Sequence, residues 1–149
     1  MKIPIDIRVR LERITPDPFR KGEEISEKDD FCVSGTLRKT KNSLRVEYTE
    51  KELSTTTIID AFKDNTITVN RLGPINSHMV FADKKVHTCI FNTGFHPMQM
   101  QVCTKNLKNS LTMDGGKIEV DYTIEIVGNL AERSKICFSV SPDASILKS

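Results

Sequence analysis

One arginine interrupts the apolar face of a predicted strand. Ile67, Val69 and Arg71 lie two residues apart, so their side chains share one face of the strand predicted over 66–72. A guanidinium on the buried face of a sheet is costly unless it is paired. Arg71 is therefore a candidate anion anchor inside a barrel cavity. The alternative is an arginine at the strand end, whose head group reaches the rim or pairs with Glu50 or another acid.

Parity along the strands selects the partners of such an anchor. Tyr48 and Tyr122 have the inward parity of their strands, and their hydroxyl groups would complete a polar spot beside Arg71. Thr88 and Thr104, on presumed inner faces, would add two more hydroxyl groups. The side chains expected to pack against the apolar part of a ligand are Met79, Phe81 and Met100. This set predicts the binding of a small, partly apolar anion.

The signals for catalysis and metal binding are weaker. His87 and Cys89 share one face of a predicted strand, but a separation of about 6.6 Å between their Cα atoms is weak evidence for a nucleophile–base pair. The three histidines (His78, His87 and His96) fall on separate strands or loops. The chain contains no phosphate-binding loop, dinucleotide fingerprint, zinc-protease helix or nucleophile elbow. We therefore expect a protein that is not an enzyme and uses no metal or cofactor.

The elements that carry these residues are predicted to be β-strands. Apolar and polar residues alternate with a period of two along most of the chain, and a helical period is almost absent. Asp114-Gly115-Gly116 and Lys63-Asp64-Asn65 are typical of hairpin turns. Residues 16–29 are polar, carry charges of both signs and predict a mobile loop. The pattern predicts about nine or ten short strands.

Such strands have one apolar face, which a sheet must bury by closing into a barrel or by packing against a second sheet. Successive hairpins favour an up-and-down barrel, because closure removes the exposed edges. We therefore predict an all-β fold, a single antiparallel up-and-down β-barrel of about eight to ten strands, with an open sandwich as the alternative. One domain over 1–149, with its core over about 3–140, fits the length and the absence of repeats.

The composition narrows the kind of partner and the compartment. Lys and Arg number 22 against 20 Asp and Glu, a net charge of +2, which is too balanced to favour nucleic acid or an anionic membrane. No apolar run approaches the roughly 20 residues that span a bilayer, and the start of the chain is unlike a signal peptide. No Cys-x-x-Cys pair occurs among Cys32, Cys89, Cys103 and Cys137. We expect a cytoplasmic protein with four reduced thiols.

Residues 71–81, with the sequence Arg-Leu-Gly-Pro-Ile-Asn-Ser-His-Met-Val-Phe, look like the core motif of a known family. The likeness continues through Phe91-Asn92-Thr93, the alternating segment over 98–104 and the strand over 116–124. On these residues the chain resembles the uncharacterised bacterial YwiB-like family, a domain of unknown function described as a calycin-like β-barrel. The resemblance spans roughly residues 3–140. It implies a calycin-like or lipocalin-like barrel and no established activity.

Two features separate the chain from proteins of similar architecture. Family members usually carry Thr-Pro-Tyr-Gly in the loop after the seventh strand, where this chain has Thr93-Gly94-Phe95-His96. The 92–97 loop therefore departs from the family pattern. The chain also has no Trp, so the Gly-x-Trp signature that begins many lipocalins is absent.

Three functional hypotheses follow. The first is a non-enzymatic barrel that binds a small, partly apolar anionic ligand. The second is a structural or protein-interaction barrel whose interior is filled by bulky Phe and Met side chains, acting as a homodimer. The third is an enzyme with a site near His87, Cys89 and the 92–97 loop. Free volume inside the barrel distinguishes the first hypothesis from the second.

Overall fold

The structure is a computed structural model that describes residues 1–92, 97–126 and 129–142. The part of the 92–97 loop that departs from the family pattern, residues 93–96, lies outside the described residues. The strands are β1 (Lys2–Pro16), β2 (Glu24–Lys39), β3 (Ser43–Glu50), β4 (Thr55–Phe62), β5 (Ile67–Leu72), β6 (Asn76–Phe81), β7 (Val86–Asn92), β8 (Pro97–Asn109), β9 (Gly116–Ile126) and β10 (Asn129–Pro142). A 3-10 turn, η1 (Lys51–Leu53), joins β3 to β4.

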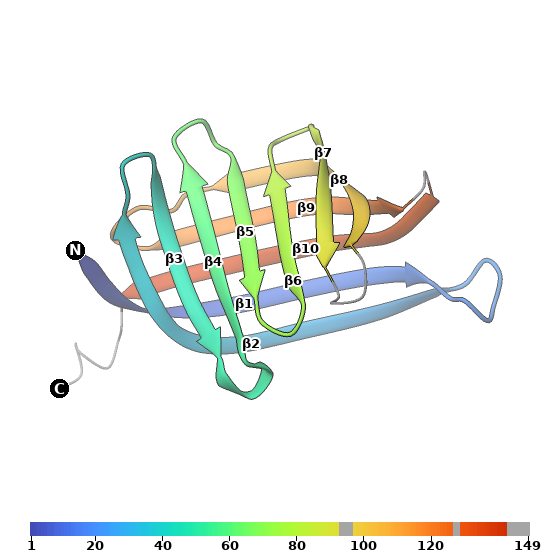
Figure 1. The fold of residues 1–149 in the computed structure, drawn as a ribbon, viewed down its shortest axis with the longest axis horizontal. Coiled ribbons are helices and arrows are strands. Elements are labelled where there is room, and N and C mark those ends of the chain that lie inside the picture. The colour runs from blue at the N-terminus through green and yellow to red at the C-terminus, as the bar shows by residue number, and fades with distance from the viewer. Residues whose placement is uncertain (93–96, 127–128, 143–149) are drawn as a thin grey trace.

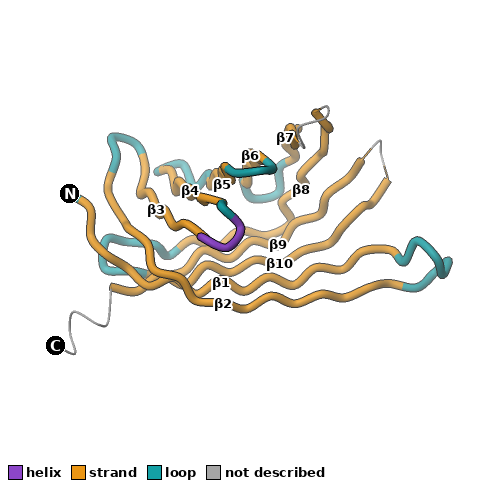
Figure 2. Tube along the Cα trace, turned by 60° about the horizontal axis from the view of Figure 1, so that its bottom comes forward, coloured by secondary structure: helices purple, strands orange, loops and turns teal. Residues whose placement is uncertain are grey.

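Each strand pairs antiparallel with the next strand in the chain, and β1 pairs with β10 to close the barrel. The predicted all-β, up-and-down barrel is therefore confirmed. Figure 1 shows the short strands β3 to β7 in front, crossing the long strands β8, β9, β10, β1 and β2 behind them. Figure 2 shows that the long strands extend beyond the short ones, so the β1–β2 hairpin projects as an arm.

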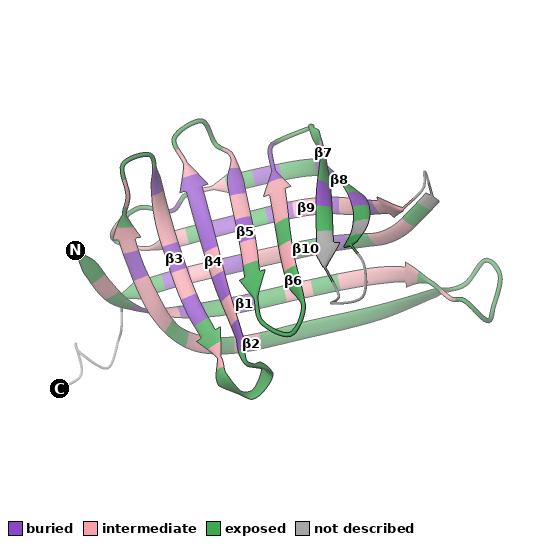
Figure 3. Cartoon of the chain, viewed as in Figure 1, coloured by how far each residue is buried: buried purple, intermediate pink, exposed green. Residues whose placement is uncertain are grey.

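Alternation with a period of two explains the core. On β9, for example, Ile118, Val120 and Tyr122 are buried, whereas Glu119 between them is exposed. Facing strands repeat this pattern, and Figure 3 shows the buried positions alternating with partly or fully exposed ones along the front strands. The largest fully buried side chains are Phe81, Phe138, Ile5, Ile7, Leu37, Ile59, Ile67, Ile118, Val46, Val102, Val120 and Thr57. Large apolar side chains therefore fill much of the barrel.

The hairpin turns agree with the sequence. Asn65 adopts a positive φ of 66°, and its backbone N–H donates to the Phe62 carbonyl, with 3.1 Å between nitrogen and oxygen. Gly115 and Gly116 adopt φ values of 107° and 140°. These conformations favour Asn and Gly, which explains why both turns could be read from the sequence.

The loop predicted over 16–29 is confirmed for residues 17–23, which connect β1 to β2, and is wrong for 24–29. β2 begins at Glu24 and pairs with β1 without interruption from Pro16↔Glu24 to Lys2↔Arg38. Residues 24–30 are all exposed, so they do not produce the alternation of a half-buried strand, although β1 beside them also pairs with β10 as far as Ile14. Pairing with β1 supplies the backbone hydrogen bonds that the polar sequence does not reveal.

Two other features of the wall are relevant to function. β6 and β7 pair at two positions, Asn76↔Asn92 and Ser77↔Phe91, which is the shortest ladder of the barrel among the described residues. Among the described residues, no helix is long and apolar enough to cross a membrane.

Candidate functional site

Arg71 lies near the end of β5, on the inner face of the wall. Its neighbours across the adjacent strands are Thr57 of β4 and Ser77 of β6. One guanidinium nitrogen lies 3.6 Å from Glu50 Oε1, and the side chains are 46% exposed for Arg71 and 20% for Glu50. The guanidinium thus reaches the rim and pairs loosely with Glu50, which matches the alternative that the sequence left open.

Tyr48 lies beside this arginine on β3, with Thr57 between them in the cross-strand row. The tyrosine is 5% exposed. Burial raises the pKa of its hydroxyl, while the adjacent Thr57 hydroxyl and the positive charge of Arg71 act in the opposite direction. Arg71 and Tyr48 are therefore close enough to interact electrostatically, as the parity argument predicts.

Tyr122 approaches from the opposite wall. Its ring centroid lies 4.8 Å from that of Phe81, with a tilt of 54° between the ring planes. Burial raises the pKa of Tyr122 to about 12, and the positive charges of Arg13 and Arg71 partly offset this rise. The structure thus brings Arg71 within electrostatic range of both predicted tyrosines.

Arg13 is a second cation at this end of the barrel, and the sequence reasoning missed it. It follows Val9 and Leu11 on the inner face of β1, so it breaks that face in the same way that Arg71 breaks the face of β5. Its Nε lies 3.1 Å from Glu132 Oε1, and its Nη1 lies 3.8 Å from Glu27 Oε2. The same parity test that selected Arg71 could have selected Arg13.

Buried hydroxyl groups accompany both tyrosines. Thr57 pairs with Tyr48, Thr104 pairs with Tyr122, and the two threonines are 1% and 2% exposed. Thr104 Oγ1 has no hydrogen-bond partner among the described residues, and Thr57 Oγ1 forms no bond of good geometry although it lies close to the Tyr48 hydroxyl. Buried polar atoms are normally satisfied, so each of these oxygens is available to a water or a ligand.

The apolar members of the predicted site lie in the core. Phe81 and Met100 are 2% and 9% exposed, and the partly buried Met79 packs against the same core cluster. Phe81 contacts Tyr122, and all three side chains belong to or pack against the core cluster. The prediction for Thr88 is wrong, because Thr88 is exposed while His87 and Cys89 take the inner positions of β7.

A hollow of about 320 Å³ opens beside Arg71, where the β3–β4 and β5–β6 connections meet. The residues that line it are Leu53, Thr55, Arg71, Pro74, Ile75 and Ser77. Leu53 and Ile75 are exposed apolar side chains. The hollow therefore combines an apolar rim with one half-exposed guanidinium.

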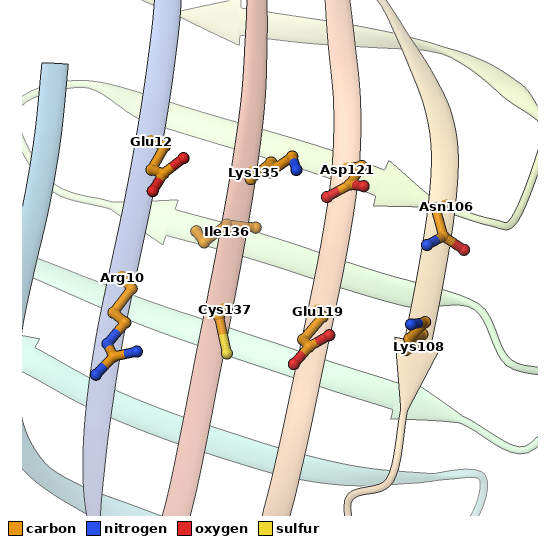
Figure 4. Close-up of a pocket in the computed structure, with 9 residues that line it drawn as sticks. All are labelled: Arg10, Glu12, Asn106, Lys108, Glu119, Asp121, Lys135, Ile136 and Cys137. Carbon is orange, nitrogen blue, oxygen red and sulfur yellow. The ribbon is translucent and has the colours of Figure 1, made fainter. Parts of the chain in front are cut away.

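A second hollow, of about 430 Å³, lies on the outer face of β1, β10, β9 and β8. Figure 4 shows its side chains in two rows across the strands, Arg10, Cys137, Glu119 and Lys108 in one, and Glu12, Lys135, Asp121 and Asn106 in the other. Three cationic and three acidic side chains line it. This charge balance gives no preference for an anion. The charged residues alternate with core positions and therefore lie on the outer face, away from the Arg71 end.

His87 and Cys89 share the inner face, but the environment of Cys89 opposes catalysis. The thiol is 2% exposed, and burial raises its pKa. A catalytic cysteine needs the thiolate, which is favoured by a lowered pKa. Within the described residues, no group of three His, Cys, Asp or Glu side chains could hold a metal ion.

These observations define a closed antiparallel β-barrel with a filled core and one polar end, at which two arginines and two buried tyrosines meet. The chain belongs to the family described as Domain of unknown function (DUF1934), whose model matches residues 15–137. It is similar in structure to the ywiB protein from Bacillus subtilis, with a TM-score of 0.70 and 20% sequence identity over 93% of this chain and 92% of that chain. The resemblance to the YwiB-like family is thus confirmed. No curated protein matches the chain.

Proposed function

We propose that this protein is a non-enzymatic barrel that binds a small, partly apolar anion at its Arg71 end. The observation that carries the proposal is the position of Arg71, which lines the 320 Å³ hollow and acts electrostatically on Tyr48 and Tyr122. Its bond to Glu50 is long, at 3.6 Å, so an anion of better geometry can compete with that carboxylate. The exposed Leu53 and Ile75 would contact the apolar part of the ligand.

Further observations support this assignment. Thr57 lies between Tyr48 and Arg71 in the cross-strand row, so it adds a buried hydroxyl group beside the arginine. The raised pKa of the Cys89 thiol argues against a cysteine nucleophile. The four cysteines are separate thiols, which suits a reducing compartment such as the cytoplasm.

Substitution of Arg71 by Met tests the proposal. The anionic fluorescent probe anilinonaphthalene sulfonate should bind the native protein and bind Arg71→Met about tenfold or more weakly, since a charged hydrogen bond contributes about 1.5–3 kcal/mol. Arg8→Met is the matched control, because Arg8 is similarly exposed, at 47%, and is also ion-paired. Equal affinity for the native protein and Arg71→Met would refute Arg71 as the anchor.

The stability of Arg71→Met distinguishes this role from a structural one. An exposed ion pair contributes about 0–1 kcal/mol, so the variant should unfold at nearly the native urea concentration. A loss of about 3–5 kcal/mol would mean that Arg71 is needed to neutralise a buried Glu50.

The second candidate is a structural or protein-interaction barrel with a filled interior, in the form of a homodimer. It is favoured by the packing of Phe81, Phe138 and their neighbours, which leaves the free volume at the barrel ends and outer face. Native mass spectrometry of freshly purified protein would detect a retained ligand under the first proposal and a dimer without ligand under the second.

A further inference from the structure

One long strand edge of the barrel has no partner strand among the described residues. β2 pairs with β1 along its whole length, but its other edge pairs with β3 only over Gly35–Lys39. The edge from Glu24 to Ser34 is therefore free over roughly 35 Å, at about 3.4 Å per residue. Figure 3 shows this part of β2 exposed along the arm, and every residue from Glu24 to Asp30 is exposed.

Two devices that block strand pairing, proline and bulges, are absent from this edge, and its protection rests on charged side chains. The segment over 24–34 contains no proline, and its register with β1 runs without a bulge. Two of its outer-face acids are drawn toward the neighbouring strands. Asp30 accepts two hydrogen bonds from Arg8, at 3.0 and 2.8 Å, and Glu24 is ion-paired with Arg133. The backbone edge is thus open to another strand.

The charge of the edge selects the partner. Glu27 and Asp29 lie two residues apart on the inner face, opposite Arg13 and Leu11 of β1, and Glu27 Oε2 lies 3.8 Å from Arg13 Nη1. Lys28 between them has the outer parity and lies 4.0 Å from Glu12 Oε1. A second copy paired antiparallel about any residue from 27 to 30 would set like charges opposite each other, which is destabilising. A strand with basic side chains opposite Glu27 and Asp29 would instead form attractive cross-strand pairs.

We propose that residues 24–34 of β2 receive an extended segment of a partner protein that carries Lys or Arg at alternate positions. The segment adds a strand to the sheet, so backbone hydrogen bonds supply affinity and the basic side chains supply specificity. The surface is distinct from the Arg71 hollow, and the proposal does not depend on anion binding.

A synthetic ten-residue peptide of alternating Val and Lys, labelled with a dye, is the probe. Its binding to the full-length protein is followed by fluorescence anisotropy, and hydrogen exchange of the β2 amides is measured with and without peptide. We expect saturable binding and slower exchange within 24–34. Glu27→Lys/Asp29→Lys should weaken binding about tenfold or more, because two attractive pairs become repulsive.

Three controls make the result decisive. Glu119→Lys/Asp121→Lys has the same spacing and charge change on the outer face of β9, and it should leave affinity unchanged. A peptide N-methylated at alternate residues keeps its charge but loses backbone donors, so it should not bind. An alternating Val and Glu peptide should also fail.

Four outcomes would overturn the proposal. They are absence of saturable binding by the Val–Lys peptide, equal binding of the N-methylated peptide, equal weakening by the β9 control variant, and protection of 24–34 by self-association in the absence of peptide. The last outcome would assign the edge to a second copy of this chain.

Discussion

The chain offers a direct optical test of its polar end. It contains two tyrosines and no Trp, so tyrosinate absorbance near 295 nm reports on Tyr48 and Tyr122 alone. Burial raises the pKa of Tyr122 from its ordinary value of 10 to about 12, and the pKa of Tyr48 is also raised. In the native protein, neither tyrosine should ionise as the pH passes through about 10. Both should do so in denaturant.

The same shift makes stability depend on pH. Below pH 10 both the folded and the unfolded states carry a neutral Tyr122, so its ionisation has no effect. Between pH 10 and about 12 the unfolded chain ionises first and stability falls. The slope is about 1.36 kcal/mol per pH unit for this group, giving a loss of roughly 2–3 kcal/mol near pH 12.

Urea unfolding at pH 9 and pH 11 would measure this loss, and absorbance titration would measure the ionisation itself. Tyr122→Phe should remove most of the extra pH dependence, whereas Tyr48→Phe retains it and isolates the Tyr122 titration. A native Tyr122 that ionises near pH 10 would refute the claim that it is buried at the site.

Other parts of the fold give three further predictions. Gly35→Ala should destabilise the protein by about 1–3 kcal/mol in urea unfolding, because its Cβ would lie 2.3 Å from the Glu47 carbonyl oxygen. The control is Gly22→Ala, which has open space but a φ of +85° and should cost about 1 kcal/mol. Equal effects of the two substitutions would contradict the close approach of β2 and β3. Asp60→Ala should lower the free energy of unfolding by about 3 kcal/mol, the lower end for a broken buried ion pair. Asp60 accepts hydrogen bonds from Arg45 at 2.8 and 3.1 Å, but Arg45 is 32% exposed and can turn to solvent once Asp60 is removed. A loss below 1 kcal/mol in the same assay would disprove this expectation. Four thiols should titrate in denaturant without reductant. In the native state the exposed Cys32 should react before the buried Cys89 and Cys103. Fewer than four thiols in freshly purified protein would contradict this prediction.

Strand periodicity was readable because burial in a sheet repeats every two residues. Val120 and Tyr122 alternate with Glu119 and Asp121 on β9, and this pattern alone places the tyrosine inside. The same logic placed Arg71 on the inner face with Tyr48. The class of fold and most members of the candidate site therefore follow from local sequence.

Parity failed where both faces of a strand are suitable for burial. On β7, Val86 and Ile90 suggested an inward face that includes Thr88, yet these apolar side chains are more than half exposed. Pairing of Cys89 with Met100 and of His87 with Val102 turns the other face inward. A shift of one residue reverses both faces, and the neighbouring strand decides between them.

Tertiary structure also decided what the charged residues contact. The sequence of 24–29 has no apolar alternation, but β1 provides a complete set of backbone partners and converts a predicted loop into a strand with a free edge. Arg13 and Arg71 are far apart in the chain, and closure of the barrel brings both within electrostatic range of Tyr122. Local sequence determines which side chains share one face of a strand. Which face turns inward, and how far apart the walls lie, depend on pairing between distant segments as the barrel closes.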